Sequence, residues 1–298
     1  MKKIYSLFIG LLLLLAGNAF SQDLDALLDA ETKPTVNYAH ATFKASRIIN
    51  GHSIEQMKEK QLDFRISHRF GTLNNGLYGL FGLDQSLIHF SLEYGLKDWL
   101  MLGAGRGSLN KTYDGFAKIR LLRQSSGAKF MPVHVSYFTS LEMNTLKFQE
   151  RPAGTSNYFS SRLTYVNQLL IARKFNENLS VQLTPTYIHR NLVKTEIDQN
   201  DIYALGIGTR YKLSKRLSLN AEYYYTYNPN SKFLDPRPYN ALSFGVDIET
   251  GGHVFQIMVT NSQGMREGSF IPQTTGNWMD GDIHLGFNIS RVFAFNKK

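Results

Sequence analysis

The chain has 298 residues, a formal net charge of +9, 13% aromatic residues and no cysteine. The absence of cysteine excludes a disulfide scaffold and cysteine-based metal or nucleophile chemistry. The length fits one barrel domain, and the many Tyr and Phe residues suit strands and membrane interfaces.

Residues 1–21 have the pattern of a secretory signal peptide. Lys2 and Lys3 precede an apolar run of roughly 10 residues, which is too short to span a membrane as a helix. Small residues at Ala19 and Ser21 predict cleavage before Gln22. Removing Lys2 and Lys3 lowers the formal charge from +9 to +7, so the mature chain stays basic.

Residues 22–60 are predicted to form a segment that stays in the periplasm or folds into the lumen of a barrel. Within it, residues 42–50 alternate poorly between apolar and polar and are not counted as a barrel strand. Residues 71–86 are rich in Gly and read as a loop with a short helix, to which no role is assigned.

From residue 62 onward the sequence repeats a unit of strand, short turn, strand and longer loop. Side chains alternate across a strand, so an apolar parity and a polar parity mark its two faces. The segments with this pattern are 62–70, 87–96, 99–107, 115–123, 133–142, 159–175, 179–190, 202–213, 217–227, 241–249, 253–261 and 282–295.

The last strand has the clearest pattern and resembles the closing strand of bacterial outer-membrane barrels. Its outer parity carries Phe287, Ile289, Phe293 and Phe295, which are predicted to act as a membrane-insertion signal. Turns of a few residues alternate with loops of about ten or more, as in membrane barrels with short periplasmic turns and longer external loops.

The sequence therefore predicts an all-β fold, a transmembrane antiparallel up-and-down β-barrel of about twelve strands formed by residues 61–298. Single-chain bacterial barrels have an even number of strands. Fourteen strands remain the alternative, and would require one strand that the pattern does not reveal.

Several short motifs resemble a family of outer-membrane β-barrel proteins from Bacteroidota-type bacteria, domain of unknown function 5777. The motifs are FKASRIINGHS at 43–53, LDFRISHRFG at 62–71, FGLD at 81–84, and the stretches 103–106, 111–114 and 120–124. The resemblance implies a barrel in the outer membrane, and it implies no activity.

Charged residues on the inward parity are the candidate lumen-lining site. A ladder biased towards basic residues could select anionic solutes, whereas the alternative is a salt-bridged interior that fills a narrow barrel. The candidates are Asp63, Arg65, Arg69, Glu93, Lys118, Arg120, Glu142, Arg162, Arg210 and Lys212.

Other chemistry has less support. His134 and Ser136 share a face with Glu142 and would be the candidates in a barrel hydrolase. No metal site, cofactor or enzymatic activity is predicted, because the sequence contains no phosphate loop, zinc-helix motif or nucleophile elbow.

The leading functional prediction is an outer-membrane channel or transport protein for small solutes, anionic ones among them. The alternative is a narrow, filled barrel that anchors a periplasmic or surface complex. The expected partners are outer-membrane lipid, lipopolysaccharide, the barrel-insertion machinery and a periplasmic protein contacted through residues 22–60, and nucleic acid is not expected.

Overall fold

A computed structural model describes residues 35–148 and 157–295. The predicted signal peptide, residues 22–34 and the C-terminal residues 296–298 lie outside the described residues. The described chain has two units: a small one formed from residues 35–38 and 125–130, and a larger one that contains the rest. In the small unit, β1 (Val36–Tyr38) pairs antiparallel with β6 (Ser125–Gly127).

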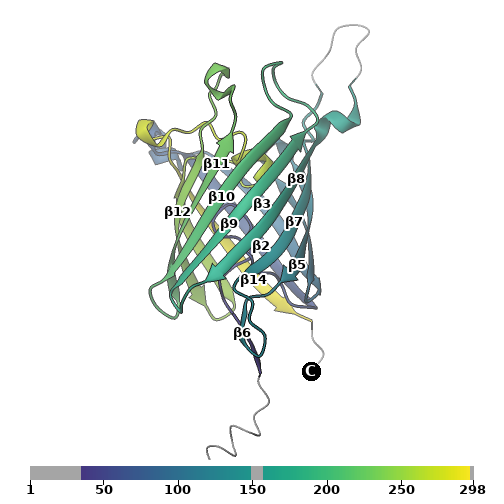
Figure 1. Cartoon of the computed structure of the whole chain (residues 1–298). Helices are drawn as coiled ribbons and strands as arrows, with labels where there is room; N and C mark the ends of the chain where they lie inside the picture. Colours follow the sequence, from purple (N-terminus) through teal and green to yellow (C-terminus); the bar gives the residue numbers. More distant parts are fainter. Residues whose placement is uncertain (1–34, 149–156, 296–298) are drawn as a thin grey trace, which may run out of the picture. The chain divides into compact units, whose positions relative to one another are not determined.

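The larger unit is a closed barrel of twelve antiparallel strands (Figure 1). This confirms the predicted fold class and strand number. The strands are β2 (Gln61–Thr72), β3 (Ser86–Lys97), β4 (Leu100–Gly107), β5 (Tyr113–Leu122), β7 (His134–Met143), β8 (Leu163–Lys174), β9 (Leu179–Arg190), β10 (Asp201–Lys212), β11 (Leu217–Tyr227), β12 (Ala241–Thr250), β13 (His253–Thr260) and β14 (His284–Ala294).

The last strand closes the barrel on the first one. Ile289 of β14 lies opposite Ile66 of β2, and the pairing extends from His284 to Ala294 with one irregularity between His284 and Gly286. The order of the other strands follows the chain, as an up-and-down barrel requires.

Short turns gather at one end of the barrel and longer loops at the other (Figure 1). The loops carry short helical turns: η1 (Leu73–Asn75), η2 (Leu80–Gly82), η3 (Leu109–Lys111), η4 (Phe159–Arg162), η5 (Ser231–Phe233), α3 (Glu267–Phe270) and η6 (Trp278–Asp280). No helix in the described part of the chain is long and apolar enough to cross a membrane.

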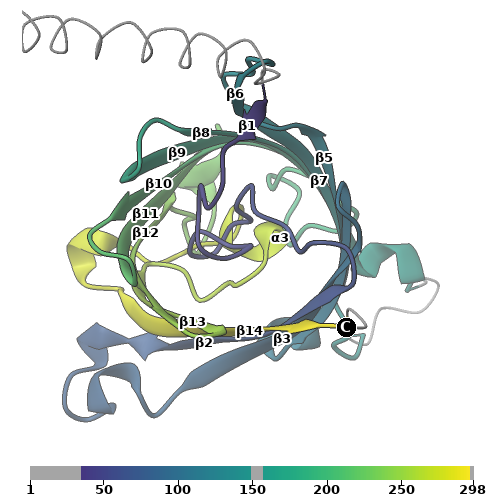
Figure 2. The same ribbon diagram turned by 90° about the horizontal axis from the view of Figure 1, so that it is seen from below.

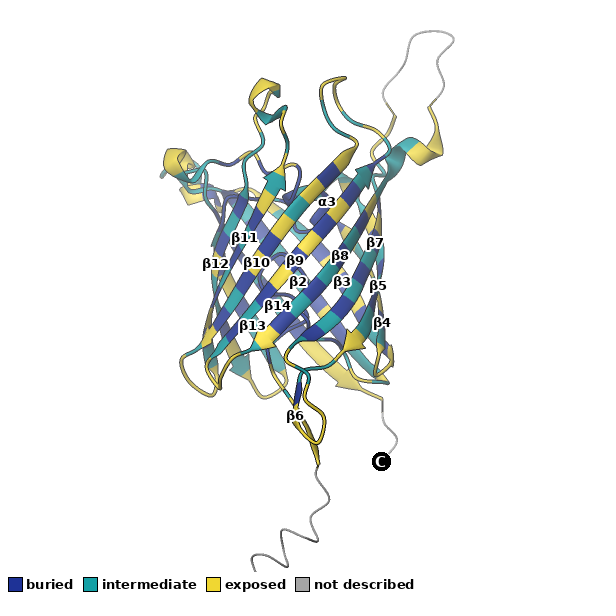
Figure 3. Ribbon diagram, in the orientation of Figure 1, coloured by how far each residue is buried: buried dark blue, intermediate teal, exposed yellow. Residues whose placement is uncertain are grey.

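Exposed and buried residues alternate along the strands, which gives the banded surface in Figure 3. In β9, Leu183 and Tyr187 are exposed while Gln182, Thr184 and Thr186 are buried. The outer face is apolar and aromatic, and the inner face is mostly polar with an apolar cluster. The barrel wall therefore matches lipid outside and a hydrated or protein-filled lumen inside.

The outer face of β13 provides a test of membrane embedding. Ile257 lies mid-strand opposite Phe287 and is 55% exposed. Replacing Ile257 with Arg should reduce the free energy of unfolding by about 2–4 kcal/mol, the cost of a cation at the bilayer midplane.

The measurement is urea unfolding of protein reconstituted in lipid vesicles, with Ile257→Leu as the matched control. A loss below about 1 kcal/mol, relative to that expected cost, would place Ile257 outside the hydrocarbon layer.

Candidate functional site

Residues 39–60 fold into the barrel lumen and are here called the plug. The plug enters where Ala39 N donates to Gln124 O (2.9 Å), and it leaves where Lys60 N donates to Gly95 O (2.9 Å). Seen from below, its chain loops inside the ring of strands (Figure 2). At its tip, Arg47 and His52 form an isolated antiparallel bridge. Thus residues 42–50 form no barrel strand, but an irregular segment that crosses the lumen.

Glu222 of β11 holds the tip of the plug through backbone amides. Its carboxylate accepts hydrogen bonds from Ile49 N (3.3 Å), Asn50 N (3.2 Å) and Gly51 N (3.0 Å). Buried backbone N–H groups need acceptors, and the Glu222 carboxyl group supplies them. A Cβ at Gly51 would lie 2.2 Å from Tyr224 Oη, so only glycine fits the tip against this wall.

Two lumen cations bind plug carbonyl groups. Lys118 Nζ donates to Glu55 O (2.8 Å), Ser53 O (2.9 Å) and Ser46 O (3.4 Å). Arg210 Nη1 donates to the carbonyls of residues 41 and 42 at 3.0 and 3.4 Å. These two basic side chains therefore supply hydrogen-bond donors to carbonyl groups of the plug backbone.

Carboxylates and amides of the wall complete the lining. Arg65 pairs with Asp63 (3.0 Å) and lies 3.8 Å from Glu93, which accepts a hydrogen bond from Ser46 of the plug. Arg69 donates to Asn50 Oδ1 at 2.7 Å.

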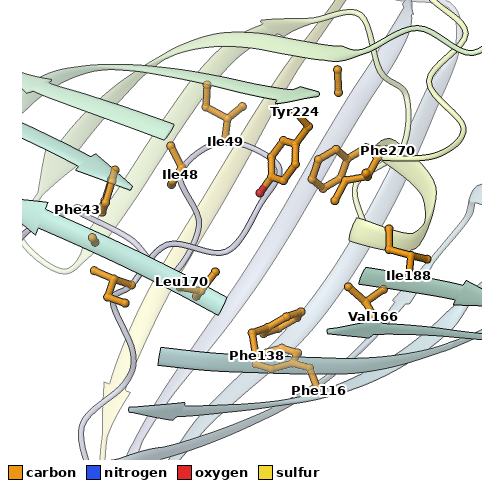
Figure 4. Close-up of a cluster of buried hydrophobic side chains, with 14 of the residues drawn as sticks. Phe43, Ile48, Ile49, Phe116, Phe138, Val166, Leu170, Ile188, Tyr224 and Phe270 are labelled. Atoms are coloured by element: carbon orange, nitrogen blue, oxygen red, sulfur yellow. The ribbon is translucent and has the colours of Figure 1, made fainter. Parts of the chain in front are cut away.

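Apolar contacts also join the plug to the wall, in a cluster of buried side chains (Figure 4). Ile48, Ile49 and Phe43 of the plug belong to the same buried cluster as Phe138 and Tyr224 of the wall. The His52 ring lies 4.2 Å from the Phe138 ring and 4.6 Å from the Phe116 ring, measured between centroids. Burial, followed by the charges of Arg47 and Lys118, lowers the pKa of His52 well below its usual value, so the ring is neutral.

A second segment closes the lumen from the side of the long loops. In the loop before β14, Glu267 lies in the short helix α3 and pairs with Arg47 of the plug at 3.1 Å. Neighbouring Arg266 pairs with Asp114 of the wall at 2.7 Å, and Gly268 N donates to Glu142 Oε1 at 2.8 Å. The plug and this loop therefore meet inside the barrel through a buried ion pair.

Beyond this loop lie two adjoining cavities of about 750 and 490 Å³. They share lining residues that include Asn110, Lys194, Gln273 and Thr275. Because these residues belong to the long loops, the cavities form a vestibule at the end of the barrel opposite the short turns.

The structure places most of the predicted lumen residues on the inner wall. Asp63, Arg65, Arg69, Glu93, Lys118, Glu142 and Arg210 are all buried there. Arg120 and Lys212 are half-buried near the short-turn ends of β5 and β10.

Arg162 is predicted to line the lumen from a strand, but the structure places it in a turn before the strand. It lies in η4, before β8 begins, where it donates to Asn144 O and Leu146 O and covers the Phe148 ring at 3.7 Å. The alternating pattern predicts a strand from residue 159, but residues 159–162 form the 3-10 turn η4 and β8 begins only at Leu163.

His134 and Ser136 are buried on the inner face of β7, but they do not form a nucleophile pair. Neither His134 Nε2 nor Ser136 Oγ has a hydrogen-bond partner among the described residues. A serine nucleophile needs its base within hydrogen-bond reach. The described residues also contain no group of three or more potential metal ligands of the His, Cys, Asp or Glu types.

The residues of the predicted insertion signal lie on the outer parity of the end of the chain. Phe293 and Phe295 are exposed, and Phe287 and Ile289 are half-buried against neighbouring strands. Their role in recognition by the insertion machinery stays a prediction.

A family model described as a membrane-bound β-barrel domain, DUF5777, matches residues 43–293. The chain belongs to this family. The match begins within the plug, so the family pattern includes the lumen-filling segment as well as the wall. Membership places the protein in the outer membrane, as predicted, with lipid around its wall.

Solved structures of several outer-membrane barrels resemble the chain. The NanC porin shares 9% identity over 79% of this chain and 100% of its own, with a TM-score of 0.47. An outer membrane channel of Pseudomonas putida F1 shares 14% identity over 80% of this chain and 97% of its own, with a TM-score of 0.49. Outer membrane phospholipase A of Escherichia coli shares 16% identity over 83% of this chain and 97% of its own, with a TM-score of 0.40. None of the curated proteins compared with the chain matches it. Likenesses this distant do not bear on function.

The contacts of Glu222 generate a first prediction for the site. Glu222→Ala should loosen residues 49–51, because each unpaired buried N–H costs roughly 1–3 kcal/mol. Hydrogen exchange of these three amides, measured in detergent micelles, should accelerate by at least roughly a hundredfold. Glu222→Gln keeps an oxygen acceptor and is the matched control. Unchanged exchange in the alanine variant would show that other contacts hold the tip.

The buried pair Arg47–Glu267 generates a second prediction. Removing either partner alone leaves an unpaired buried charge and should destabilise by about 3–5 kcal/mol, whereas removing both should cost less than the sum. A double-mutant cycle of Arg47→Met and Glu267→Gln, followed by thermal unfolding, measures this coupling. Additive losses would show that plug and loop are energetically independent.

Proposed function

We propose that the protein is an outer-membrane channel for small solutes that its own plug closes at rest. The observation that carries this proposal is the path of the plug, because both of its ends lie at the short-turn end of the barrel. A segment that enters and leaves through one mouth can withdraw through that mouth without threading an end or breaking wall pairing. The vestibule on the other side supports the same interpretation, since it is lined by the long loops and a solute can enter it from that end.

The energetics of the plug support closure at rest. Glu222 and Lys118 each make three hydrogen bonds to it, and Arg210 and Gln256 make two each. These contacts oppose release of the plug, because withdrawal would leave buried polar groups of plug and wall without partners. Free diffusion through the lumen is therefore not the resting behaviour.

Withdrawal of the plug would also change the charge of the lumen. Lys118, Arg210 and Arg69 would lose partners that now satisfy them, and their charges would line the open path. This favours anionic solutes in the open state. The proposal assigns no enzymatic activity, in keeping with the unpartnered His134 and Ser136.

A specific observation favours the second candidate, a filled barrel that anchors other proteins. The plug packs into the wall with an apolar cluster as well as with polar contacts, as a permanent core would. The two candidates differ in whether the plug ever leaves its site.

Locking the plug separates the two candidates. A Cβ built at Gly208 would lie 3.5 Å from both Cγ1 and Cγ2 of Ile48, which brings Cβ atoms near the 3.5–4.5 Å that a disulfide needs. The natural chain has no cysteine, so an Ile48→Cys, Gly208→Cys pair would be unique. A second variant replaces residues 46–53 with a Gly-Ser linker of equal length.

Planar-bilayer conductance is the measurement. The wild-type protein and the oxidised lock should be almost silent, and the linker variant should conduct, with a current that falls when Arg65 and Arg69 are also changed to Ala. The two single cysteine variants are the controls for the lock. Steady wild-type current that the lock does not reduce would overturn the gating role. A folded linker variant that stays silent would favour the filled anchor.

A further inference from the structure

The vestibule outside the plug carries an inference of its own. Its lining combines charged residues with a group of hydroxyl and amide side chains, such as Thr112, Asn144, Thr164, Gln273 and Thr275. Apolar residues, among them the prolines at 236 and 272, interrupt this polar lining. The mixture of hydrogen-bonding groups and small apolar faces is the one expected for a polyhydroxylated ligand, because a sugar ring presents hydroxyl groups at its rim and C–H groups on its faces.

The charges around the vestibule are largely satisfied by protein groups. Arg190 pairs with Asp198 at 3.1 Å, and Asp282 accepts a hydrogen bond from Asn74 at 2.7 Å. Arg162 donates to two backbone carbonyls, and Glu142 accepts from Gly268 N. The exposed charges that remain are Lys194 and Asp235, of opposite sign. The vestibule therefore has little net charge with which to attract an ion.

We propose that the vestibule is a binding site for polyhydroxylated solutes of mono- to disaccharide size, recognised through their hydroxyl groups and not through their charge. A volume of about 750 Å³, with an adjoining 490 Å³, is ample for such a ligand. The site is at the outer end of the proposed path, so the inference names the solute class for that function. Any selection of solutes by their charge would take place in the lumen, below the vestibule.

The floor of the site connects it to the plug. Gln273 and Thr275 follow α3 in the loop whose Glu267 pairs with Arg47. Phe270 of the same helix packs edge-on against Tyr224, with ring centroids 5.1 Å apart. A ligand bound to this loop thus rests on the segment that contacts the plug tip.

Calorimetric titration of the protein in detergent micelles tests the proposal. The ligands are maltose, its carboxylate counterpart maltobionate, and citrate, an anion with only one hydroxyl group. Maltose and maltobionate should bind with dissociation constants within about threefold of each other, and citrate should not bind, because the vestibule has few unpaired charges.

The variant Gln273→Ala, Thr275→Ala should weaken binding of both sugars at least tenfold, as expected when several hydrogen bonds to a ligand are lost. Gln85→Ala, Ser86→Ala is the matched control, since both residues are exposed where another long loop meets β3, and they line neither cavity. The control should bind as the wild type does. Sugar binding that the Gln273, Thr275 variant leaves intact would show a different site.

Two further outcomes would overturn the proposal: no binding of either sugar, or citrate binding tighter than maltose. The same titration with the oxidised Ile48→Cys, Gly208→Cys lock distinguishes this inference from the gating proposal. Binding should persist when the plug is locked, because the vestibule lies outside it. A channel that gates without binding sugars would leave the gating proposal intact and sink only the vestibule site.

Discussion

Backbone groups of the plug have no strand beside them to pair with, yet they are buried in the middle of a membrane barrel. Each amide and carbonyl left without a partner there costs free energy comparable to a lost hydrogen bond. The inner wall meets this constraint with side chains: Glu222 for amides, Lys118, Arg210 and Gln256 for carbonyls. This requirement explains why the inner wall carries both acidic and basic side chains, and why Lys118 and Arg210 are bound to the plug.

The same requirement explains what the sequence could predict and what it could not. Alternation along a strand reveals which face a residue occupies, so the barrel, its twelve strands and the inward position of residues such as Arg65 and Lys118 followed from the pattern. The partner of an inward residue depends on a segment with no periodicity of its own. Residues 42–50 alternate poorly because their two faces meet a polar wall and an apolar cluster at irregular intervals.

Two features of the site were therefore beyond reach of periodicity. The inward cations looked available for solutes, whereas they bind plug carbonyls, since nothing in the strand pattern indicates what fills the lumen. The loop before β14 looked like an external connection, whereas Glu267 and Phe270 turn inward and are fully buried. Two sequence signals point to these features. One is the pairing of an acidic and an aromatic residue, Glu267 and Phe270, in a long loop. The other is Gly51 within the motif at 43–53.

The plug also lies across the seam where the barrel closes. Asn50 accepts from Arg69 of β2, while Asn288 of β14 donates to the carbonyl of the neighbouring Ile49 and accepts from Arg69. First and last strands are thus cross-braced from inside by one short stretch of chain that is made before either of them. The segment that obstructs the finished lumen therefore also fastens together, from inside, the two edge strands that close the cylinder.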